Sequence, residues 1–266
     1  MLDKFNRKIN YLRISVTDRC NLRCRYCMPH CGVKWLQPED IIKYEEIIEV
    51  VEFVIGKDIN KIRLTGGEPL VRKNIVKLVN ALANIKGIKD LAMTTNGVLL
   101  KDYAQELAAA GLHRINISLD TVDPIKFKNI TRGGDINKVF AGIEEAKKAG
   151  LFPVKINCVI NKWTTAEDAL AVRKFCFDNG LEPRYISEMS LTEGSFGIVD
   201  GGTGGDCSHC NRVRLTSNGM FKPCLFSDLE FNIRKLGIEK AFLSAVNSKP
   251  EKGCKNHTNF FNNIGG

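Results

Sequence analysis

The amino-acid sequence predicts an α/β protein built around a parallel sheet, because strand and helix patterns alternate along the chain. Six short β-prone runs recur between segments whose apolar residues repeat at helical spacing. These runs are Asn10–Thr17, Lys61–Thr65, Leu91–Thr95, Arg114–Asp120, Val154–Ile160 and Arg184–Met189. Strands separated by helices predict a parallel sheet with right-handed crossovers, in an open or closed βα barrel, and an open doubly wound sheet is the alternative.

The predicted helices lie between these strands, and each carries apolar residues three and four positions apart. They are Ile41–Ile55, Ile75–Ile85, Tyr103–Ala110, Lys138–Ala149 and Glu167–Asn179. Three of them are followed by a glycine, namely Gly111, Gly150 and Gly180. Glycine is common just after a helix, so these positions predict where the helices end.

Several predicted strands alternate polar with apolar residues, whereas strands buried on both faces are usually apolar throughout. In the first strand, Arg13 and Ser15 alternate with Leu12 and Ile14. Helices must cover the apolar face, so the polar face is predicted to line a cavity inside the barrel. Basic residues on that face predict a large anionic ligand.

Composition places the chain among ordinary globular proteins: 266 residues, 44% hydrophobic and 26% charged. This excludes disordered and collagen-like classes, and ten cysteines are too few for a disulfide-stapled scaffold of this length. The first residues are charged and no long apolar stretch follows, so we expect neither a signal peptide nor a membrane span. We therefore expect a cytoplasmic protein whose cysteines are reduced or bind metal.

Residues 191–266 differ in pattern from residues 1–190, and we predict two regions with these bounds. The stretch Gly194–Gly205 contains GGTGG and has no helical period, so it is typical of a loop or linker. The part beyond it carries four of the ten cysteines.

A first cysteine cluster directly follows the first predicted strand, where barrel active sites lie. Cys20, Cys24 and Cys27 have the spacing C-x3-C-x2-C. Three thiolates can bind three irons of a cubane cluster and leave the fourth iron open. A zinc site with Cys31 as fourth ligand is the alternative.

A second cluster, Cys207, Cys210 and Cys224, has the spacing C-x2-C-x13-C and again offers three thiols. Zinc would need a fourth ligand, for which the candidates are His209, Cys254 and His257. Spacing alone leaves zinc and iron–sulfur open for this set.

Basic residues follow the second cluster closely. Arg212 and Arg214 stand just after Cys210, and guanidinium groups suit polyphosphate oxygens. With Arg13, Arg63 and Lys155 on the predicted polar face, five cations are expected to converge on one cavity. Because a buried unpaired charge is costly, these residues predict a phosphate-rich anion as ligand.

Two motifs at successive strand ends resemble those of radical S-adenosylmethionine (SAM) enzymes. CNLRCRYC resembles their cluster motif, and LTGGEP resembles the motif that holds the SAM amino group. The resemblance implies a [4Fe–4S] cluster that cleaves SAM to a 5′-deoxyadenosyl radical. It also implies an incomplete (βα)6 TIM-like radical SAM barrel with a small C-terminal iron–sulfur region. The positions that match SAM contacts are Tyr26, Gly67, Ser118 and Met189.

A narrower resemblance covers nearly the whole chain. YLRISVTDRCNLRCRYCMP, IRLTGGEPL, TTNG, RINISLD, NRVRLT and the terminal Gly265–Gly266 are similar to the molybdenum cofactor biosynthesis protein A family, the GTP 3′,8-cyclases. This implies conversion of GTP to 3′,8-cyclo-7,8-dihydro-GTP, the first step of molybdopterin biosynthesis. It also implies a second [4Fe–4S] cluster, on Cys207, Cys210 and Cys224, that binds the guanine ring. The positions that match GTP contacts are Arg13, Arg63, Thr94, Lys155, Arg212, Val213 and Arg214.

The same resemblance implies partners. We expect a reductant protein that supplies electrons to the cluster, and a downstream cyclic pyranopterin monophosphate synthase. A homodimer is the assembly considered. We expect binding to neither nucleic acid nor a membrane. The chain departs from the family between Met189 and Cys207, where typical members carry a considerably longer segment, and again after Cys224. Wall elements of the substrate chamber are therefore expected to be missing.

Two other functions are compatible with these patterns. One is a paralogous two-cluster radical SAM enzyme that acts on another nucleotide or a peptide. The other is a basic, zinc-bearing nucleic-acid-binding module, which would be colourless and bind nucleic acid in a salt-dependent way. The remaining cysteines Cys31, Cys158 and Cys176 are expected to be incidental or buried thiols.

Overall fold

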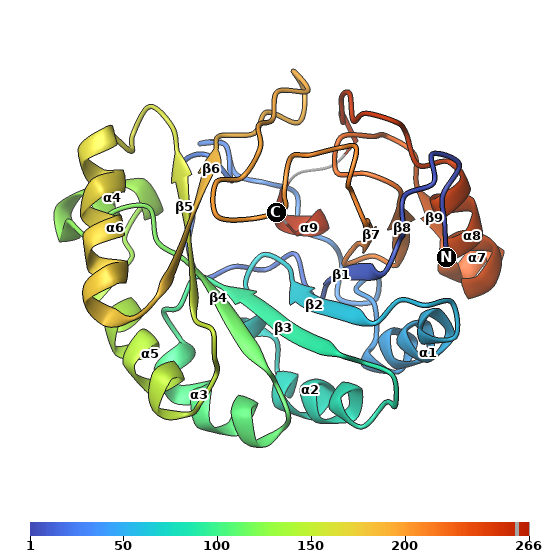
Figure 1. The fold of residues 1–266 in the computed structure, drawn as a ribbon, viewed down its shortest axis with the longest axis horizontal. Coiled ribbons are helices and arrows are strands. Elements are labelled where there is room, and N and C mark those ends of the chain that lie inside the picture. Colours follow the sequence, from blue (N-terminus) through green and yellow to red (C-terminus); the bar gives the residue numbers. More distant parts are fainter. Residues whose placement is uncertain (259–260, 266) are drawn as a thin grey trace.

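The computed structural model describes residues 1–258 and 261–265, and its centre is one curved sheet with helices on the outside (Figure 1). The sheet order is β6-β5-β4-β3-β2-β1-β7-β8-β9, and its two ends do not pair. The first six strands are β1 (Tyr11–Ser15), β2 (Lys61–Thr65), β3 (Asp90–Thr95), β4 (Arg114–Ser118), β5 (Lys155–Ile160) and β6 (Glu182–Ser187), all parallel. The predicted incomplete barrel is confirmed, and each predicted strand is present within a few residues.

The helices that cover the sheet are α1 (Tyr44–Ile55), the short 3₁₀ helix η1 (Pro69–Val71), α2 (Ile75–Ala83), α3 (Leu100–Ala109), α4 (Pro124–Thr131), α5 (Ile136–Lys148) and α6 (Ala166–Asn179). The five predicted helices are confirmed. The sequence prediction missed α4, although Asp123 caps its first two N–H groups and Pro124 occupies its first position. None of the described helices is both long and apolar enough to cross a bilayer.

The alternation read from the sequence separates the two faces of the sheet. Leu12 and Ile14 are fully buried in the core between sheet and helices. Arg13 stands between them on β1 and lines the opposite, inner face. Burial of the apolar face therefore stabilises the fold, and the polar face lines an interior cavity.

The C-terminal region continues this sheet instead of forming a separate layer. Strand β7 (Arg212–Leu215) pairs in parallel with β1, so that Arg214 lies opposite Arg13. Strands β8 (Met220–Lys222) and β9 (Phe231–Asn232) follow in antiparallel register. The sheet is continuous across the predicted boundary between residues 1–190 and 191–266. That these are two separate regions stays a prediction.

Helices α7 (Ile233–Leu236) and α8 (Ile238–Asn247) anchor this region to the barrel. Phe242 of α8 packs edge-on against Phe53 of α1, with ring centroids 5.9 Å apart. It also packs against Phe221 of β8 at 5.5 Å. Aromatic pairs in this geometry add to the hydrophobic gain, so α8 holds the last strands of the sheet in place.

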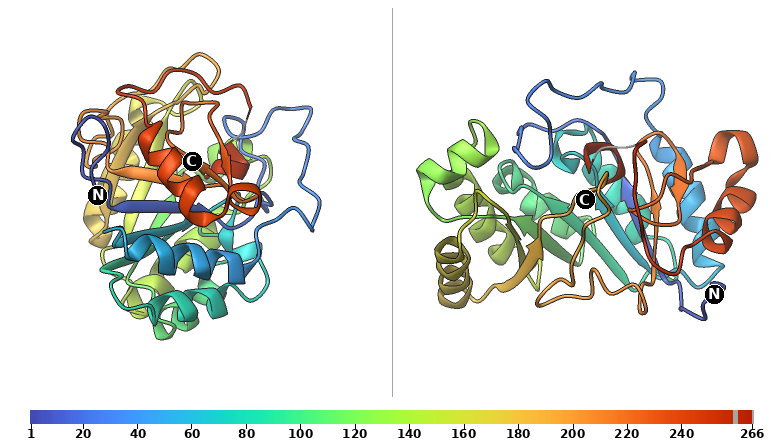
Figure 2. Two further views of the ribbon diagram at one scale, coloured as in Figure 1. Left: turned by 90° about the vertical axis from the view of Figure 1, so that its right-hand side faces the viewer. Right: turned by 90° about the horizontal axis from the view of Figure 1, so that it is seen from above.

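The chain end enters the barrel. Helix α9 (Phe261–Ile264) lies near the middle of the molecule in all views (Figures 1 and 2), and Ile264 is fully buried. A Cβ on Gly265 would stand 2.1 Å from Thr65 Oγ1, so only glycine fits there. Gly266, which belongs to the expected tail, lies outside the described residues.

The loops after β1 and β2 are joined backbone to backbone. The N–H of Gly67 donates to Thr17 O at 2.8 Å, and the N–H of Glu68 donates to Arg19 O at 2.8 Å. A Cβ on Gly67 would lie 2.3 Å from Arg19 O. The second glycine of GGEP is therefore required by this close approach, whatever else it contacts.

We expect Gly67→Ala to lower the free energy of unfolding by about 2 kcal/mol or more, because one of the two backbones must move apart. Gly56→Ala is the matched control: Gly56 has φ −64°, and its Cβ would stand 3.4 Å from Phe53 O. The control should change stability by less than about 1 kcal/mol. Urea denaturation under anaerobic conditions measures both, and equal effects of the two substitutions would contradict this explanation.

Candidate active site

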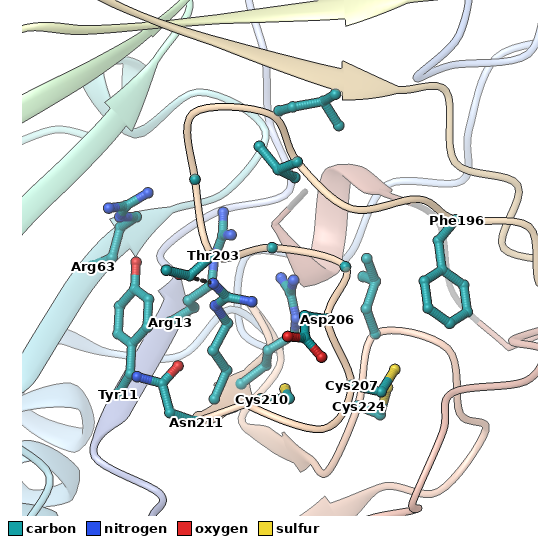
Figure 3. A pocket seen from close by; sticks show the side chains of 18 of the residues that line it. Tyr11, Arg13, Arg63, Phe196, Thr203, Asp206, Cys207, Cys210, Asn211 and Cys224 are labelled. Carbon is teal, nitrogen blue, oxygen red and sulfur yellow. Dashed lines mark hydrogen bonds between the residues drawn. The ribbon is translucent and has the colours of Figure 1, made fainter.

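A basic cavity of about 350 Å³ opens on the inner face of the sheet. Residues of all seven strands from β1 to β7 line it, and a glycine-rich loop covers one side (Figure 3). Among the described residues, its acidic lining residues are Asp90 and Asp206, and its basic ones are Arg13, Lys61, Arg63, Arg114, Arg184, Arg212, Arg214 and Lys249. The cavity is therefore built for an anion.

The two carboxylates do not neutralise most of this charge. Asp90 accepts from Arg114 Nε at 2.8 Å and is thereby engaged. Asp206 accepts from Ser208 and contacts His209 Nδ1 at 2.7 Å. Among the described residues, no carboxylate lies within ion-pair distance of the remaining inner arginines Arg63, Arg184 and Arg212.

Burial and mutual repulsion act on these guanidinium groups together. Burial, with added repulsion from Arg114 and Arg184, lowers the pKa of Arg63. Burial and Arg114 likewise lower the pKa of Arg184. Guanidinium groups nevertheless stay protonated in proteins, so the cost is relieved only by an anion that enters the cavity.

The structure places four of the seven predicted GTP-contacting residues on this cavity: Arg13, Arg63, Arg212 and Arg214. Thr94 and Lys155 are not among its lining residues, and the Lys155 ammonium pairs with Glu182. Val213 points to the other face of β7 and is fully buried in the core. Four of the five cations expected to converge therefore lie at this cavity, and Lys155 does not. GTP contact by Thr94, Lys155 and Val213 stays a prediction.

Sequence reasoning missed several cations of the cavity. Arg114 opens the same polar alternation as Asn116 and Ser118, so that alternation could have revealed it. Arg184 is the first residue of the predicted strand Arg184–Met189, and no motif marks it. Lys249 follows α8 and reaches the cavity only through tertiary packing, for which the sequence contains no local signal.

The first cysteine set lies in the loop after β1. Cys20 Sγ accepts from the N–H of Leu22 at 3.4 Å and from Asn96 Nδ2 at 3.8 Å. Burial and the neighbouring Cys20 raise the pKa of Cys27 to about 12. Burial and Cys27 raise that of Cys24 as well. These thiols thus lie close to one another and need a metal's positive charge to become thiolate ligands.

The second set, Cys207, Cys210 and Cys224, lines the basic cavity, and Figure 3 shows it at the end away from Arg63 and Tyr11. Buried Lys249 donates to Arg212 O at 2.7 Å and to Pro223 O at 2.9 Å. Although burial opposes ionisation, Lys249 and Arg212 hold the pKa of Cys210 below its ordinary value. Thiols and guanidinium groups therefore face the same space.

Each set offers three thiols, which fits the donor chemistry of a cubane cluster with one open iron. In the described part of the chain, no three His, Cys, Asp or Glu side chains form a site for a metal ion. A cubane gives each thiolate its own iron, so its cysteines do not surround one common point. Of the three thiols expected to be incidental or buried, Cys158 and Cys176 are buried and Cys31 is exposed; Cys254 is exposed as well.

The predicted SAM-contacting residues stand at the carboxyl side of the sheet. Ser118 ends β4, Gly67 follows β2, and Met189 follows β6 and lines the cavity. The Tyr26 hydroxyl donates to the Asp120 carboxylate, which also accepts from the N–H of Val159 at 2.8 Å. The structure thus brings together loops from several strand ends, and SAM contact by these four residues stays a prediction.

Glu68 of the GGEP motif has a structural task in this chain. Its fully buried carboxylate accepts from the N–H of Leu70 at 3.0 Å, from Thr95 Oγ1 at 2.7 Å and from the N–H of Asn96 at 2.7 Å. Burial raises its pKa to about 7. Glu68 therefore ties the end of β3 to the loop after β2, on which Gly67 stands.

Comparison with protein families gives two matches. Residues 14–176 match the radical SAM superfamily, and residues 163–252 match the family described as Molybdenum Cofactor Synthesis C. Relatives named GTP 3′,8-cyclase align along most of the chain. That of Thermodesulfovibrio yellowstonii is 40% identical over 312 residues, covering 97% of each chain. That of Clostridium botulinum is 42% identical over 290 residues, covering 93% of this chain and 91% of the relative.

The 312-residue alignment is longer than the 266 residues of this chain, so the relative contains segments that this chain lacks.

Solved structures confirm the fold. Streptococcus suis SuiB bound to S-adenosylmethionine has a TM-score of 0.68 and 17% identity, covering 91% of this chain and 66% of SuiB. Native anSMEcpe with bound AdoMet has a TM-score of 0.62 and 17% identity, covering 87% and 80%.

The Tyr26–Asp120 pair makes stability depend on pH. Burial raises the pKa of Asp120 to about 6, from an ordinary value of 3.8. The folded state therefore holds this proton more tightly than the unfolded state, and stability falls as the pH rises from about 4 to 6. Asp120→Asn carries no such proton. We expect its free energy of unfolding, relative to wild type, to rise by roughly 2–3 kcal/mol across that interval.

Urea denaturation between pH 4 and pH 7 measures this difference. Asp102→Asn, at an exposed position of α3, is the control and should follow the wild-type pH dependence. If Asp120→Asn ran parallel to wild type, the raised pKa of Asp120 would be wrong.

Proposed function

The chain belongs to the radical SAM superfamily and, within it, to the family of GTP 3′,8-cyclases, and from this we propose that it converts GTP to 3′,8-cyclo-7,8-dihydro-GTP. This is the first step of molybdopterin biosynthesis. The observation that carries the proposal is the cavity in which unneutralised arginines and three cysteines face one another. A triphosphate and a purine ring need such a pair of neighbouring subsites.

Two [4Fe–4S] clusters and SAM are the proposed cofactors. When bound, SAM and the cluster on Cys20, Cys24 and Cys27 supply a 5′-deoxyadenosyl radical that takes hydrogen from ribose C3′. The protein's part is to hold the reactants and keep out water. Tyr26, Gly67, Ser118 and Met189 are the proposed SAM contacts, supported by their positions at or after strand ends.

The inner arginines are proposed to hold the triphosphate. Arg13, Arg63, Arg212 and Arg214 approach the cavity from the neighbouring strands β1, β2 and β7. Their planar, permanently charged forks match phosphate oxygens and orient the nucleotide. Cys207, Cys210 and Cys224 would hold the second cluster, whose open iron would bind the guanine ring.

The Arg214 guanidinium already donates to the carbonyl of Gly265. This bond ties the chain end to the same array that is proposed to bind substrate. A phosphate that reaches Arg214 must share it with this carbonyl or displace it, so substrate binding and tail position are coupled.

Partners follow from the proposed reaction. A radical SAM reaction needs an electron, so a reductant protein is proposed to deliver it. The product would pass to cyclic pyranopterin monophosphate synthase. The proposed location of the protein is the cytoplasm, and the proposed oligomeric state is a homodimer.

A second candidate is a paralogous two-cluster radical SAM enzyme with a different nucleotide substrate. One observation favours keeping it: the chain lacks segments that an aligned GTP 3′,8-cyclase contains. Arginines recognise phosphates and do not read the base. Specificity for guanine therefore rests on the second cysteine set and the walls around it.

Anaerobic incubation of the cluster-loaded protein with SAM, reductant and GTP tests both. We expect 5′-deoxyadenosine and a cyclised guanine nucleotide in equal amounts. ATP, CTP and UTP are each tested as alternative substrates in place of GTP. SAM cleavage that ignores GTP but responds to another nucleotide would replace the first candidate by the second.

Cys24→Ala should abolish SAM cleavage, because the first cluster loses a ligand. Iron content should fall from about eight to about four per chain, as expected when one cubane of two is lost. Cys31→Ala is the control, since Cys31 is exposed and outside the proposed ligand set. It should retain both iron and SAM cleavage. Full activity in Cys24→Ala would remove Cys24 from the ligands.

A further inference from the structure

The segment Gly201–Gly205, called here the glycine ribbon, forms one wall of the basic cavity. Its sequence is GGTGG, and four of its residues, Gly202 to Gly205, line the cavity. With one small side chain in five residues, the ribbon presents mainly backbone to whatever fills the space. The ribbon crosses the cavity in Figure 3, with Thr203 among the arginines.

The ribbon is made of glycine because there is no room for side chains behind it. Gly201 and Gly205 have φ values of +73° and +82°, which favour glycine. A Cβ on Gly205 would lie 1.9 Å from Gly197 O, and one on Gly204 would lie 2.7 Å from Val199 Cγ2. The ribbon is thus pressed against residues 197–199, and its position at the cavity is set by that packing.

Several backbone donors of the ribbon are unused. The bonds that hold it run from the N–H of Gly202 to Val199 O and from the N–H of Val199 to Gly204 O. No described residue accepts from the N–H groups of Thr203, Gly204 or Gly205. Successive backbone N–H groups without a partner are a recurring feature of anion-binding loops.

Thr203 adds a side-chain donor. Its Oγ1 accepts from Arg212 Nη2 at 2.8 Å, the dashed line in Figure 3. Because this bond uses an oxygen lone pair, the hydroxyl hydrogen is still able to donate to an anion. Arg212 therefore positions Thr203 and adds its own charge beside it.

Buried positive charge stands next to the ribbon and points independently to an anion. Arg63 lines the same cavity and is 6% exposed, and no described residue forms a hydrogen bond with its Nε. Arg184 Nε is likewise buried without a partner among the described residues. The Arg184 Cδ lies 3.7 Å from the place a Cβ would take on Gly202. An anion at the ribbon would satisfy both kinds of donor.

We propose that the glycine ribbon is a phosphate-binding subsite, in which Thr203 and the unused N–H groups bind a phosphate of the nucleoside triphosphate opposite Arg63 and Arg184. The subsite rests on the proposed function for the identity of the whole substrate. Its own chemistry requires only a phosphate group. The ribbon then supplies neutral donors that orient the phosphate, while the arginines supply charge.

The nearly isosteric pair Thr203→Asp and Thr203→Asn tests this, since the two differ by one negative charge. Cluster-loaded protein is titrated with GTP, with inorganic triphosphate and with guanosine, anaerobically and without SAM, so that no turnover occurs. We expect Thr203→Asp to bind GTP and inorganic triphosphate at least tenfold more weakly than Thr203→Asn, and guanosine equally well. Thr192→Asp, at an exposed position before the ribbon, is the charge control and should change binding less than twofold.

Equal affinity of wild type and both Thr203 variants for GTP and triphosphate would overturn the subsite. Folded, iron-loaded wild type that binds inorganic triphosphate but not GTP would instead overturn the proposed function and keep the subsite. If Thr203→Asp fails to fold, Thr203→Val decides: loss of the hydroxyl should weaken triphosphate binding about tenfold. Unchanged affinity in Thr203→Val would overturn the proposal.

Discussion

Positive charge inside the sheet, without carboxylates to balance it, is the constraint on which the site depends. Arg63 is almost fully buried and Arg184 partly so, and the carboxylates nearby are engaged elsewhere. Guanidinium groups do not escape this cost by losing their proton. The folded protein is therefore under electrostatic strain that a bound polyanion relieves, and binding of such an anion should stabilise the fold by linkage.

The alternation of polar and apolar residues made much of the fold predictable. Leu12 and Ile14 lie in the core and Arg13 on the cavity, as that pattern indicates. The apolar pattern does not predict helix α4, because its eight residues, PIKFKNIT, have only a weak apolar face and place Ile125 in solvent. Motif spacing predicted both cysteine sets, since their residues are close in sequence. The local signal for helix α4 is the capping residue Asp123 followed by Pro124.

Tertiary pairing is what sequence reasoning could not supply. The second cysteine set faces the inner arginines because β7 adds to the edge of β1, a contact between residues about two hundred positions apart. Lys249 reaches Arg212 O and Pro223 O through packing within the C-terminal region, which has no local sequence signal either. The charge pattern suggested that Lys155 would join the cavity, but Glu182, its neighbour across β5 and β6, takes its ammonium. A local pattern cannot tell which partner a lysine finds.

The pairing of β1 with β7 also has a consequence during synthesis. Strand β1 leaves the ribosome before the other strands of the sheet, pairs with β2 early, and keeps its other edge unpaired until Arg212–Leu215 has emerged. At about 5–20 residues per second, that wait is on the order of ten seconds. An unpaired strand edge is open to pairing with other chains in the meantime. Yield from a fast, crowded expression host should therefore respond to translation speed and to chaperones that shield nascent strands.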